Sequence, residues 1–232
     1  DETNIAVTNG SQNSFFLLFN LLAGRTGAND RHRPMLLPLT PEYIGYSETG
    51  IETDFFVSAK PRIELQQNSI FKYRLDEDAI KQFEDIAAIC VSRPTNPTGN
   101  VHTSQELRKL HQIARQREVP LIIDCAYGYP MPDISYVESR FDWQPGMIVT
   151  MSLSKIGMPG LRTGIVVAEP AIIESLGRMN AVLNLSPGAV GPALALNMLR
   201  DKSLLQLSRE HIQPYYQKKS QTAVARIQEL TR

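Results

Sequence analysis

The chain has 232 residues, and its 24 lysines and arginines balance 24 aspartates and glutamates, so the formal net charge is zero. This balance argues against a nucleic acid or an acidic membrane surface as the main partner. The composition, with 42% hydrophobic and 21% charged residues, is that of an ordinary globular protein.

No apolar stretch in the sequence reaches the length of a membrane-spanning helix, and we recognise no signal peptide. We therefore expect no membrane partner and a cytoplasmic protein. The two cysteines, Cys90 and Cys125, lie in or beside apolar runs and are predicted to be buried thiols. The four histidines show no ligand spacing, so no metal site is predicted.

Apolar runs alternate with helical patterns along the chain. The predicted strands are 5–8, 35–39, 54–57, 86–91, 121–123, 147–151 and 165–168. A helix is predicted over 15–22, another after the capping box at 103–106, and the pattern is mainly helical from 170 onward. Short apolar strands separated by helices favour a parallel-rich sheet covered on both faces, with ligands at the carboxyl ends of the strands.

The ends of the sequence suggest a piece of a longer protein. The run at 5–8 reads as a core strand with only a short polar lead before it, and the last residues, 228–232, continue a helical pattern. We expect one α/β domain over 1–200, followed by a long helix over 201–232.

The most informative residue is Lys155, which closes the run Ser-Leu-Ser-Lys at 152–155. Arg162 follows seven residues later. A lysine beside two hydroxyls and an arginine suits an amine that condenses with an aldehyde next to a bound phosphate. The alternative is a solvated loop lysine.

A turn at 8–12 joins the first strand to the first helix. Gly10 permits a tight turn, and the first amides of the helix, at Ser11 and Gln12, are free donors. A phosphate there would gain the favourable end of the helix dipole. The alternative is a plain connection between a strand and a helix.

Two further motifs follow strands. The loop Ser-Arg-Pro-Thr-Asn-Pro-Thr-Gly-Asn at 92–100 is stiff and offers side-chain donors, although it could be a structural turn before the capped helix. Asp124 ends the strand 121–123 and needs a cationic or hydrogen-bonding partner to stay ionised. A protonated pyridine nitrogen would be such a partner, and a nearby helix start is the alternative.

Aromatic side chains at Tyr43 and Tyr46 follow the second predicted strand. One of these rings could stack on a planar cofactor, or both could serve packing alone.

In this order the motifs resemble those of the fold-type-I enzymes that depend on pyridoxal 5'-phosphate (PLP), in the aspartate aminotransferase superfamily. The resemblance covers essentially the whole chain. It implies the large PLP-binding domain of that fold, with a mainly parallel seven-stranded sheet flanked by helices and the small domain largely missing. It also implies transfer of an amino group between an amino acid and a 2-oxo acid by a homodimer.

The resemblance assigns roles to the motif residues. Lys155 matches the lysine that binds the cofactor aldehyde and moves the substrate proton, Asp124 matches the acid on the pyridine nitrogen, and Tyr127 matches a donor to the phenolic oxygen. These three residues are the catalytic candidates. The cofactor-binding residues implied are Gly10, Ser11, Gln12, Tyr43, Asn96, Asp124, Ala126, Tyr127, Ser152, Ser154, Lys155 and Arg162.

Further expectations come from the same resemblance. Tyr46 matches a group that supports the aspartate, and the peptides before Pro41 and Pro97 are expected to be cis. The chain departs from the family at Arg93, which we expect to face solvent rather than a substrate carboxylate. The family's N-terminal segment and its C-terminal arginine for the substrate carboxylate are absent from this sequence. A lyase or another transaminase on the same scaffold, or a PLP-binding regulatory module without turnover, remain as alternatives.

Overall fold

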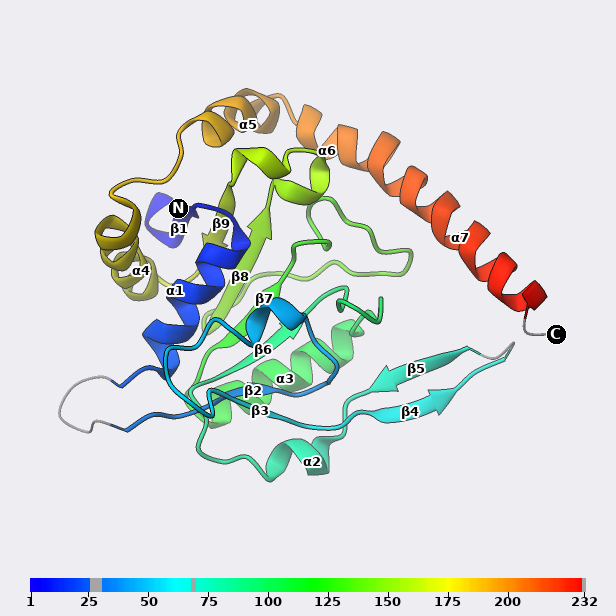
Figure 1. Cartoon of the computed structure of the whole chain (residues 1–232), viewed down its shortest axis with the longest axis horizontal. Helices are drawn as coiled ribbons and strands as arrows, with labels where there is room; N and C mark the ends of the chain where they lie inside the picture. Colours follow the sequence, from blue (N-terminus) through cyan, green and yellow to red (C-terminus); the bar gives the residue numbers. More distant parts are fainter. Residues whose placement is uncertain (26–30, 68–69, 231–232) are drawn as a thin grey trace.

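The computed structural model describes residues 1–25, 31–67 and 70–230, and its centre is a seven-stranded sheet (Figure 1). The strands, in spatial order, are β1 (Ile5–Thr8), β9 (Gly164–Val167), β8 (Met147–Ser152), β7 (Leu121–Asp124), β6 (Ala88–Ser92), β2 (Met35–Leu37) and β3 (Phe56–Ser58). β9 runs antiparallel to β1 and β8, and the other neighbours are parallel. The prediction of a mainly parallel seven-stranded sheet is confirmed, and each predicted strand is present, the first with the predicted bounds and the other six with shifted ends.

Helices cover both faces of the sheet because successive side chains of a strand point to opposite sides. In β6, Ala88 and Cys90 pack in one core cluster with α1 (Ser11–Ala23) and α4 (Pro170–Asn184). Ile89 and Val91 pack in the other cluster, with α3 (Ser104–Gln116). Figure 1 shows α3 on the side of the sheet away from α1. The central strands are therefore apolar on both faces, as expected for a covered parallel sheet.

The start of α3 is fixed by the predicted capping box. The Thr103 hydroxyl accepts from the Glu106 backbone N–H, and the Glu106 carboxylate accepts from the Thr103 backbone N–H at 2.8 Å. Such a cap contributes about 1 kcal/mol of helix stability. It also determines where the loop after β6 must end.

The predicted core strand at 5–8 is instead an edge strand, because β1 pairs with β9 alone. Ile5 is 49% exposed, and Thr8 is the buried residue of this strand. The expectation of a core strand is therefore wrong. Its polar end nevertheless sits at the site described below.

Among the strands and α-helices of the described residues, three were not expected from the sequence. The strands β4 (Arg62–Leu65) and β5 (Phe71–Arg74) form a separate two-stranded antiparallel hairpin, and the short helix α2 (Glu77–Lys81) follows it. In Figure 1 this hairpin projects from the body of the domain.

The chain after α4 is helical for most of its length. The remaining elements are α5 (Val190–Arg200), α6 (Ser203–Leu207), a π-helical turn (Ser208–Ile212) and α7 (Gln213–Leu230). None of the residues that make up α7 is buried, and this helix extends away from the sheet (Figure 1). Residues 231–232 of the predicted terminal helix lie outside the described residues. In the described ranges, no helix combines the length and apolar character needed to cross a membrane.

Candidate active site

The predicted site residues lie at one edge of the sheet because several strands end there. β6, β7 and β8 are parallel, and β1 shares their direction since both β1 and β8 are antiparallel to β9. β9 begins at the same edge. The pairs in register at this edge are Ser92 with Asp124, Asp124 with Thr150, Ser152 with Gly164 and Thr8 with Gly164. Motifs that are far apart in the sequence are therefore neighbours in space.

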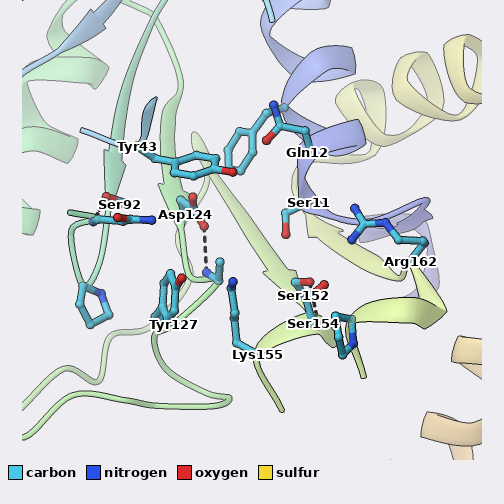
Figure 2. A pocket seen from close by; sticks show the side chains of 15 residues that line it. Ser11, Gln12, Tyr43, Ser92, Asp124, Tyr127, Ser152, Ser154, Lys155 and Arg162 are labelled. Carbon is cyan, nitrogen blue, oxygen red and sulfur yellow. Dashed lines mark hydrogen bonds between the residues drawn. The ribbon is translucent and has the colours of Figure 1, made fainter. Parts of the chain in front are cut away.

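A pocket at this edge collects the predicted cofactor-binding residues (Figure 2). Those that line it are Ser11, Gln12, Tyr43, Asn96, Asp124, Ala126, Tyr127, Ser152, Ser154, Lys155 and Arg162. Gly10, the remaining predicted residue, lies outside the lining but in close approach to Arg162. Four further residues line the pocket without having been predicted to bind the cofactor: Phe15, Pro159, and Ser92 and Pro94 from the loop 92–100.

Asp124 is a buried carboxyl that the protein holds in place with two donors. The Tyr46 hydroxyl donates to its Oδ2 at 2.7 Å, and the Ala126 backbone N–H donates to its Oδ1 at 2.8 Å. Burial raises the pKa of Asp124, while these two bonds and the charge of Lys155 oppose that rise. The predicted support by Tyr46 is confirmed. The alternative, that Asp124 caps a helix, is wrong because no helix begins in the loop that follows it, 125–130.

Lys155 lies in a short 3-10 turn, Ser154–Ile156, directly after β8. Its side chain is exposed and reaches the pocket, where Nζ stands 4.9 Å from the centroid of the Tyr127 ring. Figure 2 shows Lys155 and Tyr127 side by side, below Asp124. Among the ion pairs found in the described ranges, none involves Lys155. The amine is therefore available to a molecule in the pocket.

The other side of the pocket is suited to an anion. α1 begins after Gly10, and no side chain of the described residues caps its first turn. Gly10 has φ +92°, and a Cβ built on it would lie 2.3 Å from Nη2 of Arg162. A glycine is thus required for the guanidinium to lie against this turn. Ser11, Ser152 and Arg162 gather here (Figure 2), and Arg162 joins none of the ion pairs in the described ranges.

Of the two rings in the segment after β2, one lies where it can meet a flat ligand. Tyr43 lines the pocket, whereas Tyr46 is buried below it, and the two rings pack edge to face with centroids 5.4 Å apart. The Gln12 amide donates to the Gly45 carbonyl at 2.6 Å, which links this segment to α1. The expected cis peptides before Pro41 and Pro97 are confirmed.

Arg93 does not face solvent, so that expectation is wrong. Its side chain is 2% exposed, Nε donates to the His102 carbonyl at 2.8 Å, and Nη1 donates to the Ser139 carbonyl. The guanidinium also lies 5.6 Å from the centroid of the Phe141 ring. Arg93 is buried because distant loop segments supply carbonyl acceptors and an aromatic face to its planar group. Cys90 and Cys125 are buried free thiols, as predicted.

Comparisons with known proteins point to one family. Residues 63–231 match the family of class I and II aminotransferases. Valine–pyruvate aminotransferase of Escherichia coli (strain K12) is 50% identical over 224 residues, which cover 97% of this chain and 54% of that protein. The crystal structure of valine–pyruvate aminotransferase from Salmonella typhimurium LT2 matches with a TM-score of 0.89 at 47% identity, over 97% of this chain and 55% of that one. A histidinol-phosphate aminotransferase of Baumannia cicadellinicola is 33% identical over 59% of this chain and 38% of its own length.

The chain therefore belongs to the class I and II aminotransferases, a family of PLP-dependent enzymes. It spans about half the length of the relatives it matches.

The pocket fits PLP by the chemistry of its donors and acceptors. A buried carboxyl, Asp124, suits a protonated ring nitrogen, and the Lys155 amine suits an aldehyde. On the other side, the uncapped start of α1 and the guanidinium of Arg162 suit a phosphate.

Proposed function

We propose that this protein transfers the amino group of L-valine to pyruvate with PLP as cofactor, giving 3-methyl-2-oxobutanoate and L-alanine. The observation that carries the proposal is a single pocket lined by both the Lys155 amine and the Asp124 carboxyl. The strings TNGSQ, PEYIGY, SRPTNPTGN and MSLSK resemble those of valine–pyruvate aminotransferase. The 50% identity to the Escherichia coli enzyme of that name supports this substrate pair.

Asp124 would keep the pyridine nitrogen protonated, because a buried carboxylate is stabilised by a cationic partner. A charge-assisted hydrogen bond of this kind is worth roughly 1.5–3 kcal/mol. Asn96 and Tyr127 would donate to the phenolic oxygen, while Tyr43 and Ala126, which also line the pocket, would cover opposite faces of the ring.

The phosphate would lie at the start of α1. The residues proposed to hold it are Ser11, Gln12, Ser152, Ser154 and Arg162. Gly10 contributes by its lack of a side chain, since any larger residue would meet the guanidinium. The helix terminus and the guanidinium fork both favour an anion here.

Bound PLP supplies an electron-withdrawing ring that makes the substrate Cα proton acidic. The Lys155 amine would hold the cofactor at its aldehyde and would serve as the base that takes the proton from the substrate Cα. Tyr127, next to Lys155, keeps one side of the amine against an aromatic face. Asp124, Lys155 and Tyr127 are therefore the proposed catalytic residues.

We also propose a domain organisation, an oligomeric state and a biological role for the protein. We assign 1–200 to the PLP-binding large domain and 201–232 to a helix that leads to a small domain carrying the arginine for the substrate carboxylate. A homodimer in the cytoplasm, acting in amino-acid biosynthesis, fits the family. Support for a dimer comes from exposed apolar side chains on α4 and α5, including Val182 at 83%, Val190 at 64% and Leu194 at 53%.

A second candidate function is another amino-acid aminotransferase, or a PLP-dependent lyase, on the same scaffold. The match to a histidinol-phosphate aminotransferase shows that other substrates occur among the relatives of this chain. Incubation of the intact protein with valine and pyruvate separates these functions, because valine–pyruvate transamination must form alanine. Consumption of valine without alanine would favour the lyase, and no reaction would favour a different amino acid.

The direct test of the site is Lys155→Ala in the intact protein. The wild type should show the visible absorbance of bound cofactor, and addition of valine should remove that absorbance until pyruvate restores it. The variant should lack the band altogether because it has no amine to bind the aldehyde. An unchanged band in the variant would refute the assignment of Lys155. A wild-type band that ignores every amino acid tested would favour the regulatory module without turnover.

A further inference from the structure

Glu42 is a buried carboxyl beside the pocket that the proposed chemistry does not use. It directly precedes Tyr43 and is 9% exposed. Both of its oxygens are engaged by one residue, Ser92. The Ser92 backbone N–H donates to Oε1 at 3.0 Å, and the Ser92 hydroxyl donates to Oε2.

Ser92 connects this carboxyl to the rest of the site. It is the last residue of β6, it lies in register with Asp124, and it lines the pocket. Its hydroxyl also accepts from the backbone N–H of Asn96 at 3.3 Å. Glu42 therefore links the segment that carries Tyr43 to the strand end from which the Asn96 loop begins.

Tyr46 makes a comparable link three residues after Tyr43. Its hydroxyl donates to Asp124, at the end of β7. The buried side chain of Glu42 thus attaches the segment 42–46 to β6, and that of Tyr46 attaches it to β7. Tyr43, which lines the pocket, lies between these two residues in the sequence. Loss of either link would leave the segment with one of these two buried attachments to the sheet.

The electrostatic surroundings of Glu42 favour a neutral carboxyl. The pKa of Glu42 is raised to about 8, chiefly by burial and to a smaller extent by the charge of Asp124, although the bonds from Ser92 oppose the rise. Cys90 and Tyr46, the other titratable groups that interact with it, are buried, and burial raises the pKa of each. In the described ranges, Glu42 belongs to no ion pair. When the carboxyl is neutral, Oε1 still accepts from the Ser92 N–H, and the bond to the hydroxyl reverses: the carboxyl proton is donated to the Ser92 oxygen, which donates to Oε2 when the carboxyl is ionised.

We propose that Glu42 is a positioning residue that fastens the Tyr43 segment to Ser92, and thereby sets the spacing between the Tyr43 ring and the Asn96 loop. These are two of the parts that would hold the cofactor ring. The link between Glu42 and Ser92 stands by itself, whereas its effect on the cofactor rests on the proposed function.

The first measurement needs no cofactor and compares Glu42→Gln with Glu48→Gln in the intact protein. Glu48 is an exposed glutamate two residues beyond the segment 42–46, so it is a matched control. Glutamine reproduces the neutral carboxyl in size and hydrogen bonding. The pKa of Glu42 is raised in the fold, so its contribution is complete below its unfolded value of about 4.5 and is lost as the pH rises to about 8.

The free energy of unfolding of the wild type should therefore fall, relative to Glu42→Gln, between about pH 5 and pH 8, and level off above. The control should follow the wild type throughout. If Glu42→Gln also follows the wild type over this whole range, Glu42 is not a neutral buried carboxyl and this part of the proposal is wrong.

The second measurement is a titration with PLP. Glu42→Ala should weaken binding about tenfold because it leaves the Ser92 donors unpaired, whereas Glu42→Gln should stay within about threefold of the wild type. If the alanine variant does not fold, Ser92→Ala, which keeps the backbone donor to Glu42, replaces it and should weaken binding by a smaller factor. Wild-type affinity in the folded variant would overturn the positioning role. A wild type that binds no PLP, with the pH result intact, would count against the proposed function and not against the Glu42 link.

Discussion

The two sides of the pocket are built in opposite ways. On the acidic side, Asp124 is buried and already has two protein donors, Tyr46 and Ala126. On the cationic side, Lys155 and Arg162 are exposed and take part in no ion pair within the described ranges. The acidic side is therefore part of the folded core, whereas the two cations of the other side remain exposed.

This difference follows from the cost of burying charge. A buried carboxylate must be hydrogen-bonded by the protein or it takes up a proton. An exposed ammonium or guanidinium is satisfied by water and can exchange that water for a ligand. Substitutions on the acidic side should thus change both stability and cofactor affinity, while those on the cationic side should change affinity alone.

The largest effect is expected for Asp124→Asn, which removes the charge and keeps the volume. The catalytic efficiency should fall about a hundredfold, because a charge-assisted hydrogen bond to the ring nitrogen is replaced by a neutral one. A chromatographic assay for alanine, with PLP at saturation, measures this fall. An efficiency within a factor of about two of the wild type would show that the carboxylate is not needed.

A smaller effect is expected for Arg162→Gln on the cationic side. Affinity for PLP should fall about tenfold because the phosphate loses a charge-assisted fork, while the free energy of unfolding without ligand should not change. Arg178→Gln is the matched control, since Arg178 is an exposed arginine that pairs with Glu174 on α4. Inorganic phosphate should raise the unfolding midpoint of the wild type and of the control, but not that of Arg162→Gln. Equal protection of all three proteins would contradict the anion site.

Much of the fold could be predicted from local patterns. The apolar runs that form β6, β7 and β8 are buried, and a run of consecutive apolar residues predicts a strand that is covered on both faces. The capping box of α3 involves residues three apart, so it could also be predicted. The position of β1 at the edge of the sheet could not be predicted, because an apolar run of four residues contains no information about which strands flank it.

The parts of the site that escaped prediction depend on contacts between distant segments. Arg93 is buried by the carbonyls of His102 and Ser139, and Glu42 is held by Ser92, fifty residues away. The spacing of these residues in the sequence carries no sign of such pairs. By contrast, the order of the motifs that contain Asp124 and Lys155 predicted the pocket, because strand ends of a parallel sheet meet at one edge.

The smallest effect is expected for Tyr46→Phe, which removes one hydroxyl from the acidic side. The ring can keep its edge-to-face contacts with Phe15 and Phe19, so the packing should survive. The lost bond to Asp124 should lower the free energy of unfolding by about 1 kcal/mol and raise the pKa of Asp124 further, because that bond stabilises the carboxylate. Tyr43→Phe removes the same atom from a ring that faces the pocket and should leave unfolding unchanged. Urea denaturation of both variants at neutral pH measures the difference. Equal losses of unfolding free energy would show that the buried hydroxyl of Tyr46 stabilises the fold no more than the pocket-facing hydroxyl of Tyr43.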